Sequence, residues 1–400
     1  MKILQLAPRF PFPLDDGGKI VVANTFREFV QQGVSTILFS LNSETELPKT
    51  AIQEAEKIGK NVIFNYNTKN TIGKIARSVF TNKAIYLQKY WNKNILEAVD
   101  TLILNDKPDI LQAEHTCMTP ICLYFREKYN IPFGIRLHNI EHKIWEKYAE
   151  EMKNPFAKIY LKQQTKLLKK REIELIEQAN ISFAITQEEK KEIDRLTNNV
   201  NVHVASVGVE LDKWTPSDFS YRNKNQLVFA TTFHWIHNTN ALLWFLKNVL
   251  PIVYEKNNQV KMMIIGKNAP KWIENYANIG ANSLGYLSDI RGVVRQSAIY
   301  VAPLFVGAGI RIKILEAMAM GMPVVATSVS AAGINATEND GLFITDDKEK
   351  YAEIILELMN NAEKCENAGI RARQFVEKKF SWKENVKKMI LQYEEILKNK

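Results

Sequence analysis

The residues best suited to chemistry lie between Val301 and Thr327, in the segment VAPLFVGAGIRIKILEAMAMGMPVVAT. Its pattern predicts a buried strand, a glycine-rich turn, a helix, a glycine stop and a second buried strand. Gly307 and Gly309 free the backbone where the helix begins, so amide N–H groups can closely approach an anion. Three charged side chains follow, namely Arg311, Lys313 and Glu316. This combination suits a nucleotide diphosphate whose sugar hydroxyls need an acceptor.

The same segment also has an ordinary interpretation. Any α/β protein contains strand–turn–helix–strand units, and Lys313 with Glu316 three residues later is a common pair on a helix surface. Cations at a helix N-terminus are, however, disfavoured by the helix dipole unless an anion is bound. The charges therefore point to an anion site, with the surface pair as the alternative.

A second group of polar residues follows two predicted strands in the first half of the chain. Glu114 and His115 end the strand DILQAEH, His138 ends the strand that begins at Phe133, and Asn139 comes next. Because sites in parallel α/β sheets form at the carboxyl ends of the strands, we expect these side chains to be neighbours. Hydrogen bonding to a polyol is the role this set favours, and a structural histidine is the alternative. The spacing does not match an HExxH zinc site, and no metal is predicted.

The loop after the first predicted strand contains the run Asp15-Asp16-Gly17-Gly18. This run predicts a turn, and Lys19 is expected to open a helix. Gly17 and Gly18 would let a ligand lie against the backbone, and a plain loop is the alternative. No third glycine completes a GxGxxG pattern, so neither a nicotinamide nor another cofactor is predicted.

Length and charge limit the class of protein. A chain of 400 residues exceeds what one hydrophobic core usually serves, so two domains are expected. Residues 1–210 hold 29 Lys or Arg against 25 Asp or Glu, and the remainder holds 24 against 19. Neither half is a basic nucleic-acid-binding domain. The main local excess is nine Lys or Arg against three Glu between Lys143 and Arg171. A solvated helix face is the favoured explanation, and contact with an anionic membrane is the alternative.

Cysteine content and hydropathy set the expected location. Three cysteines, without a CxxC pair or a histidine at metal spacing, indicate neither a disulfide framework nor a zinc site. The N-terminal apolar run is too short for a signal peptide, and no segment approaches about 18 uninterrupted apolar residues. We expect a cytoplasmic protein, peripheral to the inner membrane if the basic segment contacts lipid.

Short apolar runs alternate with amphipathic stretches, which predicts two α/β halves around parallel sheets. The polar segment Gly208–Gln226 is the predicted linker, and the two halves are expected to face a cleft. The predicted strands are Lys2–Leu6, Ser35–Phe39, Val62–Phe64, Asp109–Gln112, Phe133–Leu137 and Ile181–Ile185 in the first half, and Leu227–Ala230, Val260–Ile265, Ile299–Val301, Pro323–Ala326 and Gly341–Ile344 in the second.

With these parts placed, the chain resembles the retaining GT-B glycosyltransferases of family 4 over nearly its full length. The most specific match is Glu316 within LEAMAMGMPVVA; the Gly-Gly loop, His138, VGVELDKW and GYLSDI also match. The resemblance implies two Rossmann-like domains, an acceptor-binding domain at 1–208 and a nucleotide-sugar-binding domain at 209–384. A C-terminal helix at about 385–400 would pack back on the first domain.

The resemblance also assigns roles to the second half. Glu316 would accept hydrogen bonds from the nucleotide ribose. Gly307, Ala308 and Gly309 would offer backbone amides to the donor. Arg311 and Lys313 are candidate catalytic residues that would offset the diphosphate charge as the sugar–phosphate bond breaks.

In the first half, the family pattern makes His138 a candidate catalytic residue next to the donor sugar. Gly17 and Gly18 would line the donor phosphates and the acceptor. Glu114, His115 and Asn139 are the remaining candidates for sugar or acceptor contact. The leaving phosphate is thought to help deprotonate the acceptor in this family, so neither a protein nucleophile nor a metal is required.

Two positions depart from the family pattern. The family often has a glutamate eight positions before the equivalent of Glu316, and this chain has Ala308 there. The family also often places Arg and Lys after the first strand of the second domain, where this chain reads ATTFHWIHNTNAL. Arg311 and Lys313 are predicted to replace those cations.

The expected function is therefore transfer of a sugar from a UDP- or GDP-sugar to a glycan or lipid-linked acceptor, with retention, in bacterial surface polysaccharide or lipopolysaccharide synthesis. One alternative is a GT-B-fold sugar-nucleotide epimerase, for which Glu114 and Glu141 are the candidate acid–base carboxylates. Another is a non-catalytic sugar-nucleotide-binding protein, motivated by Ala308. No nucleic-acid partner is expected.

Overall fold

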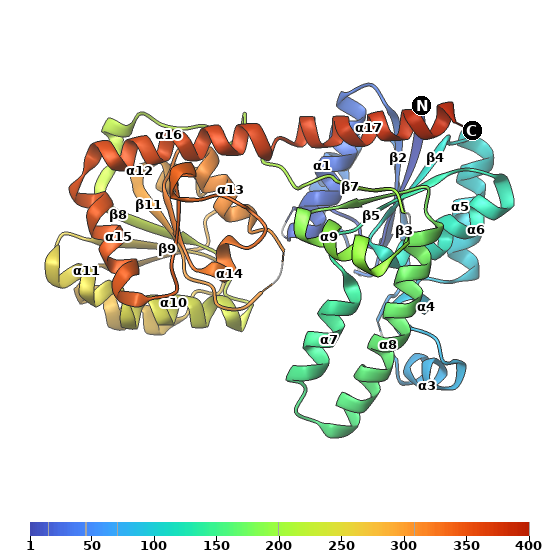
Figure 1. Ribbon diagram of the computed structural model, residues 1–400, viewed down its shortest axis with the longest axis horizontal. Helices are drawn as coiled ribbons and strands as arrows, with labels where there is room; N and C mark the ends of the chain where they lie inside the picture. The colour runs from blue at the N-terminus through green and yellow to red at the C-terminus, as the bar shows by residue number, and fades with distance from the viewer. Residues whose placement is uncertain (15, 45, 70, 199, 308, 400) are drawn as a thin grey trace. The chain divides into compact units, whose positions relative to one another are not determined.

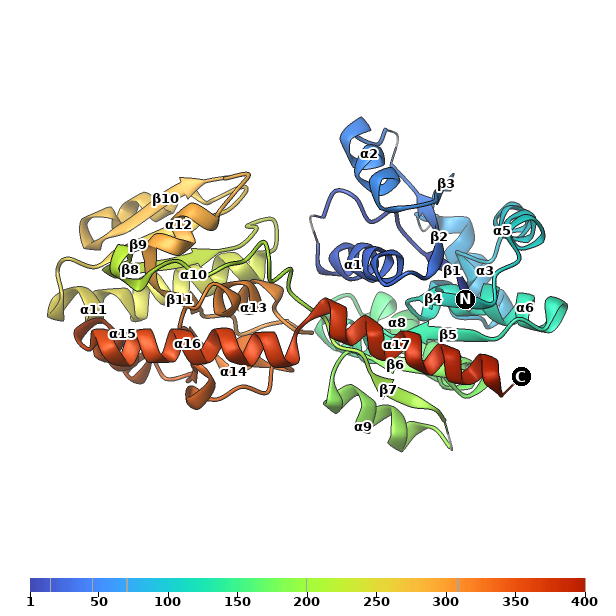
Figure 2. The same ribbon diagram turned by 90° about the horizontal axis from the view of Figure 1, so that it is seen from above.

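The structure is a computed structural model that describes residues 1–14, 16–44, 46–69, 71–198, 200–307 and 309–399. The chain divides into two compact units. Unit 1 comprises Met1–Ser206 and Trp382–Lys400, and unit 2 comprises Val207–Ser381. In each unit helices cover both faces of a parallel sheet, so each is a Rossmann-like α/β layer structure (Figures 1 and 2).

Unit 1 contains a seven-stranded sheet with the order β3-β2-β1-β4-β5-β6-β7. Side chains of β1 alternate between the two faces: Leu4 and Leu6 enter one core cluster, and Ile3 enters the cluster on the opposite face. Its strands are β1 Lys2–Ala7, β2 Ser35–Asn42, β3 Asn61–Asn65, β4 Ile110–Glu114, β5 Phe133–Arg136, β6 Ile181–Ala184 and β7 Val202–Val204.

The helices of unit 1 bury the apolar faces of the sheet, and all of them except the C-terminal α17 lie between its strands in the chain. They are α1 Gly17–Gln31, α2 Lys49–Ile58, α3 Ile72–Thr81, α4 Ile85–Gln88, α5 Lys93–Asp106, η1 Thr116–Met118, α6 Thr119–Tyr129, α7 Glu141–Glu151, α8 Pro155–Gln178, α9 Gln187–Leu196 and α17 Trp382–Lys398.

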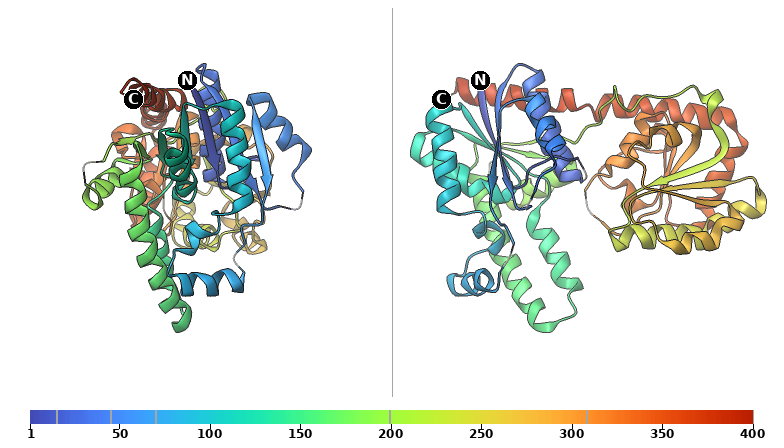
Figure 3. Two further views of the ribbon diagram at one scale, coloured as in Figure 1. Left: turned by 90° about the vertical axis from the view of Figure 1, so that its right-hand side faces the viewer. Right: turned by 180° about the vertical axis from the view of Figure 1, so that it is seen from behind.

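Two of these helices, α7 and α8, form a hairpin that projects from the sheet of unit 1 (Figures 1 and 3). The short α3 lies beside α8, and the Ser78 and Tyr160 hydroxyls are 2.9 Å apart. At the base, Gln164 Oε1 accepts a hydrogen bond from the Ile85 backbone N–H. The hairpin is therefore tied to α3 and α4 as well as to the sheet.

The C-terminal helix α17 packs within unit 1, against α1 and the sheet. The Tyr393 hydroxyl donates a hydrogen bond to Gln112 Oε1 at 3.0 Å. Gly134 on β5 makes room for this ring, because a Cβ at that position would collide with the Tyr393 hydroxyl. The last helix of the chain thus completes the core of the unit that contains the first strand.

Unit 2 contains a six-stranded sheet with the order β10-β9-β8-β11-β12-β13. Its strands are β8 Asn223–Ala230, β9 Lys261–Ile265, β10 Ala281–Gly285, β11 Ser297–Ala302, β12 Val324–Ala326 and β13 Leu342–Ile344. Its helices are η2 Phe219–Tyr221, α10 Ile236–Asn248, α11 Leu250–Lys256, η3 Lys271–Ile279, α12 Arg291–Gln296, α13 Ile312–Ala319, α14 Ser328–Ala331, η4 Glu338–Asp340, α15 Lys348–Asn360 and α16 Ala362–Lys379.

The structure corrects two local predictions. The polar segment predicted as a linker up to Gln226 is too long at its C-terminal end, because β8 begins at Asn223 and pairs there with Ser297. Gly17 and Gly18 do not form the predicted turn; they are the first residues of α1, because the Asp16 side chain caps the helix by accepting from the Lys19 backbone N–H. Asp15 lies outside the described residues.

In both sheets the chain first adds strands on one side of the first strand and then switches to the other side. In unit 1 the chain adds β2 and β3 on one side of β1 and then places β4 on the other side. In unit 2 it adds β9 and β10 on one side of β8 and then places β11 on the other. Ligands of such sheets bind outside the carboxyl ends of the strands where the order reverses. The loops after β1, β4, β8 and β11 are therefore the places to look for a site.

Candidate functional site

In unit 1, the loop after β1 leads directly into the N-terminus of α1. Arg9 Nη1 lies 3.0 Å from the Asp16 carboxylate, which also caps the helix. Gly18 faces Arg9 and His115: a Cβ built on Gly18 would lie 3.4 Å from Arg9 Nη2 and 3.7 Å from His115 Nε2. Gly17 is exposed beside it. Because the Asp16 carboxylate already pairs with the guanidinium and the Lys19 amide, the amides of Gly17 and Gly18 are the donors that this helix start can offer a ligand.

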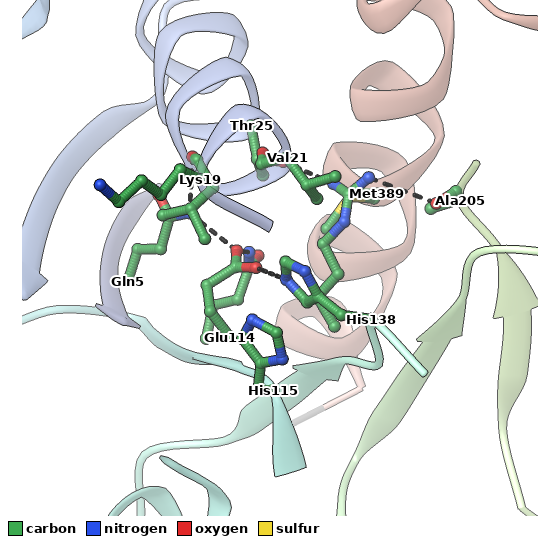
Figure 4. Close-up of polar contacts among 12 residues, drawn as sticks. Gln5, Lys19, Val21, Thr25, Glu114, His115, His138, Ala205 and Met389 are labelled. Atoms are coloured by element: carbon green, nitrogen blue, oxygen red, sulfur yellow. Dashed lines mark hydrogen bonds and ion pairs between the residues drawn. The ribbon is translucent and has the colours of Figure 1, made fainter. Parts of the chain in front are cut away.

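Glu114 and His138 form a buried pair at the ends of the adjacent strands β4 and β5 (Figure 4). His138 Nε2 lies 2.7 Å from Glu114 Oε2, and the two side chains are 4% and 0% exposed. Gln5 Nε2 donates to Glu114 Oε1 at 2.7 Å, and Gln112 Nε2 donates to the same oxygen. The carboxylate is thus fully occupied by neighbouring donors and holds the imidazole in one orientation.

The charges of this pair follow from its surroundings. Burial lowers the pKa of His138 to about 3, helped by His115 and opposed by Glu114. Burial alone would raise the pKa of Glu114, but the hydrogen bond and charge of His138, the charge of Arg136 and the Gln112 hydrogen bond lower it. Glu114 is therefore an anion and His138 a neutral imidazole that donates through Nε2, which leaves Nδ1 as an acceptor.

His115 stacks on His138, with ring centroids 3.7 Å apart and ring planes 18° from parallel. Its backbone has a φ of 66°, a left-handed conformation that non-glycine residues rarely adopt and that is often found at functional sites. His115 Nδ1 is 3.6 Å from Glu141 Oε1 at the start of α7. Asn139, half-buried, lies between β5 and α7. The structure therefore brings together Gly18, His115, Glu114 and His138, and it places Asn139 next in the chain.

A residue that sequence reasoning missed holds this arrangement in place. Glu172 on α8 accepts hydrogen bonds from the backbone N–H groups of Glu141 and His142, at 3.0 and 3.1 Å, and so caps the N-terminus of α7. The same carboxylate accepts from the Thr116 hydroxyl at 2.9 Å and pairs with His142 Nδ1 at 2.7 Å. Glu172 lies far from these partners in sequence, so no local pattern indicated it.

In unit 2, the loop after β11 leads into α13, and its two described glycines adopt conformations that other residues rarely take. Gly307 has a φ of 144° and Gly309 a φ of 75°. A Cβ at Gly307 would collide with the Arg311 guanidinium, so this glycine both turns the backbone and makes room for the arginine. Ala308, a predicted donor contact, lies outside the described residues. Arg311 occupies the N-cap position of α13.

Glu316 lies on the second turn of α13 and is buried except for 8% of its surface. Lys313 Nζ is 2.8 Å from Glu316 Oε2 and also lies over the Trp214 ring, 5.5 Å from its centroid. Burial raises the pKa of Glu316, while the charge and hydrogen bond of Lys313 and the charge of Lys213 lower it. The Lys313–Glu316 pair that was the ordinary alternative is therefore present, but its carboxylate is buried, unlike that of an exposed pair.

The C-terminal end of α13 is held by two arginines from distant parts of unit 2. Arg222 donates to the backbone carbonyls of Gly321 and Met320, at 2.7 and 2.8 Å. Arg373 on α16 donates to the Ala319 and Trp214 carbonyls, each at 2.7 Å. Cations at a helix C-terminus stabilise it through the orphan carbonyls and the dipole. These contacts hold the helix that carries Glu316 and the Trp214 segment together.

Three aromatic side chains are exposed in the loops at the same edge of the unit 2 sheet. Trp235 follows β8, Tyr286 follows β10 and Phe305 follows β11, and they are 64%, 69% and 39% exposed. Exposed aromatic faces at a ligand-binding edge can stack on a planar ring. Sequence reasoning did not single them out because an aromatic residue in a loop carries no spacing signal.

Within the described residues, no group of three or more His, Cys, Asp or Glu side chains could hold a metal ion. Over the same residues, no helix is both long enough and apolar enough to cross a membrane.

Comparison with known proteins finds a family model that matches part of unit 2. Residues 224–361 match the model of the glycosyl transferases group 1. A Klebsiella pneumoniae protein described as an uncharacterized 44.6 kDa protein in the cps region is 24% identical over 398 residues, covering 96% of this chain and 97% of its own. An uncharacterized glycosyltransferase of Methanocaldococcus jannaschii is 23% identical over 270 residues, covering 63% of this chain and 66% of its own.

Solved structures with the same fold cover the whole chain. The sucrose-phosphate synthase of Thermosynechococcus elongatus superposes with a TM-score of 0.73 at 13% identity, with all of both chains covered. Anabaena HepE, solved in complex with UDP, superposes with a TM-score of 0.71 at 13% identity, covering 99% of this chain and all of its own. The fold is thus that of the GT-B glycosyltransferases, as the sequence predicted, and together with the family match it supports a glycosyltransferase.

Proposed function

We propose that this chain is a retaining glycosyltransferase of family 4 that transfers a sugar from a UDP- or GDP-sugar to a glycan or lipid-linked acceptor. The observation that carries the proposal is the buried Glu316 carboxylate on α13. The glycine-rich loop before this helix lies where the strand order of the unit 2 sheet switches sides. The Klebsiella relative is named for a cps region, and this supports bacterial surface polysaccharide synthesis as the setting. We place the reaction in the cytoplasm, where nucleotide sugars are made.

In this proposal, unit 2 binds the nucleotide. Glu316 accepts hydrogen bonds from the ribose hydroxyls, and its ion pair with Lys313 leaves one carboxylate oxygen for them. The backbone amides of Gly307 and Gly309 bind the diphosphate, and Arg311 beside Gly307 offsets its charge. The exposed ring of Trp235, Tyr286 or Phe305 stacks on the base. HepE was solved with UDP and with UDP-glucose, which supports a uridine nucleotide as the first donor to test.

Unit 1 contributes the groups for the sugar and the acceptor. His138 accepts a sugar hydroxyl hydrogen bond at Nδ1, because Glu114 holds its other nitrogen. His115, Asn139 and the Gly17–Gly18 helix start contact the sugar, the phosphates or the acceptor. In the reaction, the acceptor oxygen bonds to the anomeric carbon as the bond from that carbon to the phosphate oxygen breaks. The acceptor proton passes to the leaving phosphate on the same face, which gives retention without a protein nucleophile.

No observation favours the two alternatives. A sugar-nucleotide epimerase would need free acid–base carboxylates, yet Glu114 is fully buried and occupied by His138, Gln5 and Gln112. A non-catalytic binding protein would not need the hydrogen bond by which Glu114 orients the His138 imidazole.

The test begins with binding, because the acceptor is unknown. Native-state ligands raise the unfolding temperature, so a panel of UDP-, GDP- and ADP-sugars should yield at least one that stabilises the wild-type protein. Glu316→Gln should lower the affinity for that nucleotide about 10- to 100-fold, which is the effect of losing a hydrogen bond to a charged group. Glu353→Gln, an exposed carboxylate on α15, is the matched control and should bind as the wild type does.

Turnover is then measured with the stabilising donor and a lipid-linked acceptor, by nucleotide release and by the anomeric configuration of the product. Arg311→Ala and Lys313→Ala should each lower kcat/KM sharply. An isomerised donor would identify an epimerase instead, an inverted product would overturn retention, and a donor panel without any stabilising nucleotide would overturn the proposal itself.

A further inference from the structure

The projecting hairpin of α7 and α8, together with α3, carries exposed apolar side chains that the proposed transfer reaction does not use. Six large hydrophobic residues of these three helices are exposed. The most exposed are Phe80 at 88%, Phe156 at 82% and Ile159 at 67%. They are accompanied by Tyr148, Ile144 and Ile75. Exposed apolar residues gathered on neighbouring helices mark an interaction surface. We call these six residues and the helices that carry them the hairpin surface.

A recess lies within this surface. A pocket of about 290 Å³ opens between α3, α4, α7 and α8, and its lining is apolar or aromatic throughout. Trp145, Tyr148 and Tyr160 contribute the aromatic part. Trp and Tyr are the residues that favour the boundary between hydrocarbon and water, because one end of each ring is apolar and the other polar.

The charge around the hairpin surface is strongly positive. From Ile72 to Gln88, which spans α3 and α4, the sequence holds three Lys or Arg and no Asp or Glu. From Lys143 to Arg171 it holds nine Lys or Arg and three Glu. Among these, Lys147, Lys153 and Lys162 are exposed. A surface with this charge favours an anionic partner and opposes pairing with a second copy of itself.

The order of residues along α8 arranges apolar and basic side chains at different distances from the tip. Phe156 and Ile159 lie in the first turns after the α7–α8 connection, and Lys162 and Lys166 follow in the same stripe at spacings of three and four. At 1.5 Å per residue, Lys162 stands about 9 Å from Phe156 along the helix axis. The apolar side chains of this stripe can enter the boundary between headgroups and acyl chains, while the long side chains of Lys153, in the α7–α8 connection, and Lys162 reach the headgroups from either side of it.

We propose that the hairpin surface docks this protein on a bilayer containing anionic lipids, with Phe80, Phe156 and Ile159 inserted and Lys147, Lys153 and Lys162 against the headgroups. Glu172 ties the surface to the candidate sugar site: it lies on α8 and caps α7 beside His115 and His138. Docking would therefore hold unit 1 where a lipid-linked acceptor is located. The interaction does not depend on the transfer reaction.

The test is sedimentation of the full chain with vesicles of phosphatidylcholine alone and of phosphatidylcholine with phosphatidylglycerol. The wild type should bind the anionic vesicles, and the binding should weaken as salt is raised. Lys147→Glu/Lys153→Glu/Lys162→Glu should lower the partition coefficient by at least about tenfold, and Phe80→Ser/Phe156→Ser should lower it similarly. Lys224→Glu/Lys261→Glu/Lys271→Glu, which reverses three exposed lysines of unit 2, should bind as the wild type does.

Circular dichroism and the unfolding temperature identify any variant that fails to fold, and nucleotide binding by unit 2 provides an independent check of each variant. Equal binding of wild type and hairpin variants, equal binding to both vesicle types, or no binding of the wild type to anionic vesicles would overturn the proposal. So would a dimer in the absence of vesicles that dissociates in Phe80→Ser/Phe156→Ser, which would assign the surface to a second copy. Because no donor or acceptor is used, the result is separate from the fate of the proposed transferase activity.

Discussion

His138 Nε2 lies 2.7 Å from Glu114 Oε2, and this hydrogen bond decides which imidazole nitrogen can meet a ligand. Neutral histidine donates from one nitrogen and accepts at the other. With Nε2 donating to the Glu114 carboxylate, Nδ1 is the acceptor. The protein therefore presents an acceptor of fixed direction at the end of β5, next to the His115 ring.

Glu114→Gln should abolish this control over the tautomer. A glutamine fills the same volume but offers both a donor and an acceptor, so His138 should populate both neutral tautomers, visible in imidazole ¹⁵N chemical shifts. His142 is the internal control: its Nδ1 faces Glu172 at 2.7 Å, so it should keep the opposite tautomer in both proteins. Turnover should fall by at least about tenfold, the equivalent of one hydrogen bond. An unchanged His138 spectrum would remove Glu114 from this positioning role.

Gly307→Ala should damage the proposed nucleotide site through the backbone. The φ of 144° is unfavourable for alanine, and the added Cβ meets the Arg311 guanidinium. We expect a loss of about 1–3 kcal/mol in unfolding free energy and weaker nucleotide binding. Urea denaturation and calorimetric titration measure the two effects.

Gly292→Ala supplies the matched control for that substitution. Gly292 lies within α12, its φ is not in the left-handed region, and a Cβ there would meet nothing within 4 Å. Alanine in this helix should therefore stabilise the protein by about 0.5–1 kcal/mol. If Gly307→Ala changed stability and nucleotide affinity no more than Gly292→Ala does, the conformation of the turn at Gly307 would not matter for binding.

Stability should fall as the pH drops from 7 to 5, and His138 should contribute to the loss. Burial depresses the pKa of His138 to about 3, so the native state keeps it neutral while the unfolded chain, with a pKa near 6.5, takes up a proton. The unfolded state then binds more protons, and stability decreases by about 2 kcal/mol over this range. His138→Asn should show a shallower pH dependence in urea denaturation. If the unfolding free energy of the two proteins changed with pH in the same way, groups other than His138 would be responsible for the pH dependence.

The sequence predicted what depends on short-range patterns. The succession of Val301, Gly307, Glu316 and Gly321 is readable because strand, turn, helix and stop follow one another within one βα unit. Glu114 and His138 could be expected at the same sheet edge because their strands were both identifiable as buried parallel strands. Local periodicity was enough for these elements.

The features that could not be predicted depend on contacts between distant segments. The capping of α7 by Glu172 and the capping of α13 by Arg373 join parts of the chain that no local pattern relates. Gly17 and Gly18 were expected in a turn because two glycines usually interrupt a helix; the Asp16 cap reversed that preference. The hairpin surface was visible in the sequence only as an excess of lysine, because exposure of Phe80 and Phe156 is decided by which helices pack around them.

The arginine caps of α13 bear on how this scaffold could change its donor. Arg222 and Arg373 fix the end of the helix that carries Glu316, while neither arginine holds the loops with Trp235 and Tyr286 among the contacts described. In the role that we propose for it, the ribose acceptor Glu316 belongs to the fixed framework, and the loops with Trp235 and Tyr286 are the parts that can vary. A replacement of these loops could then change the bound nucleotide sugar without disturbing the helix or its two arginines.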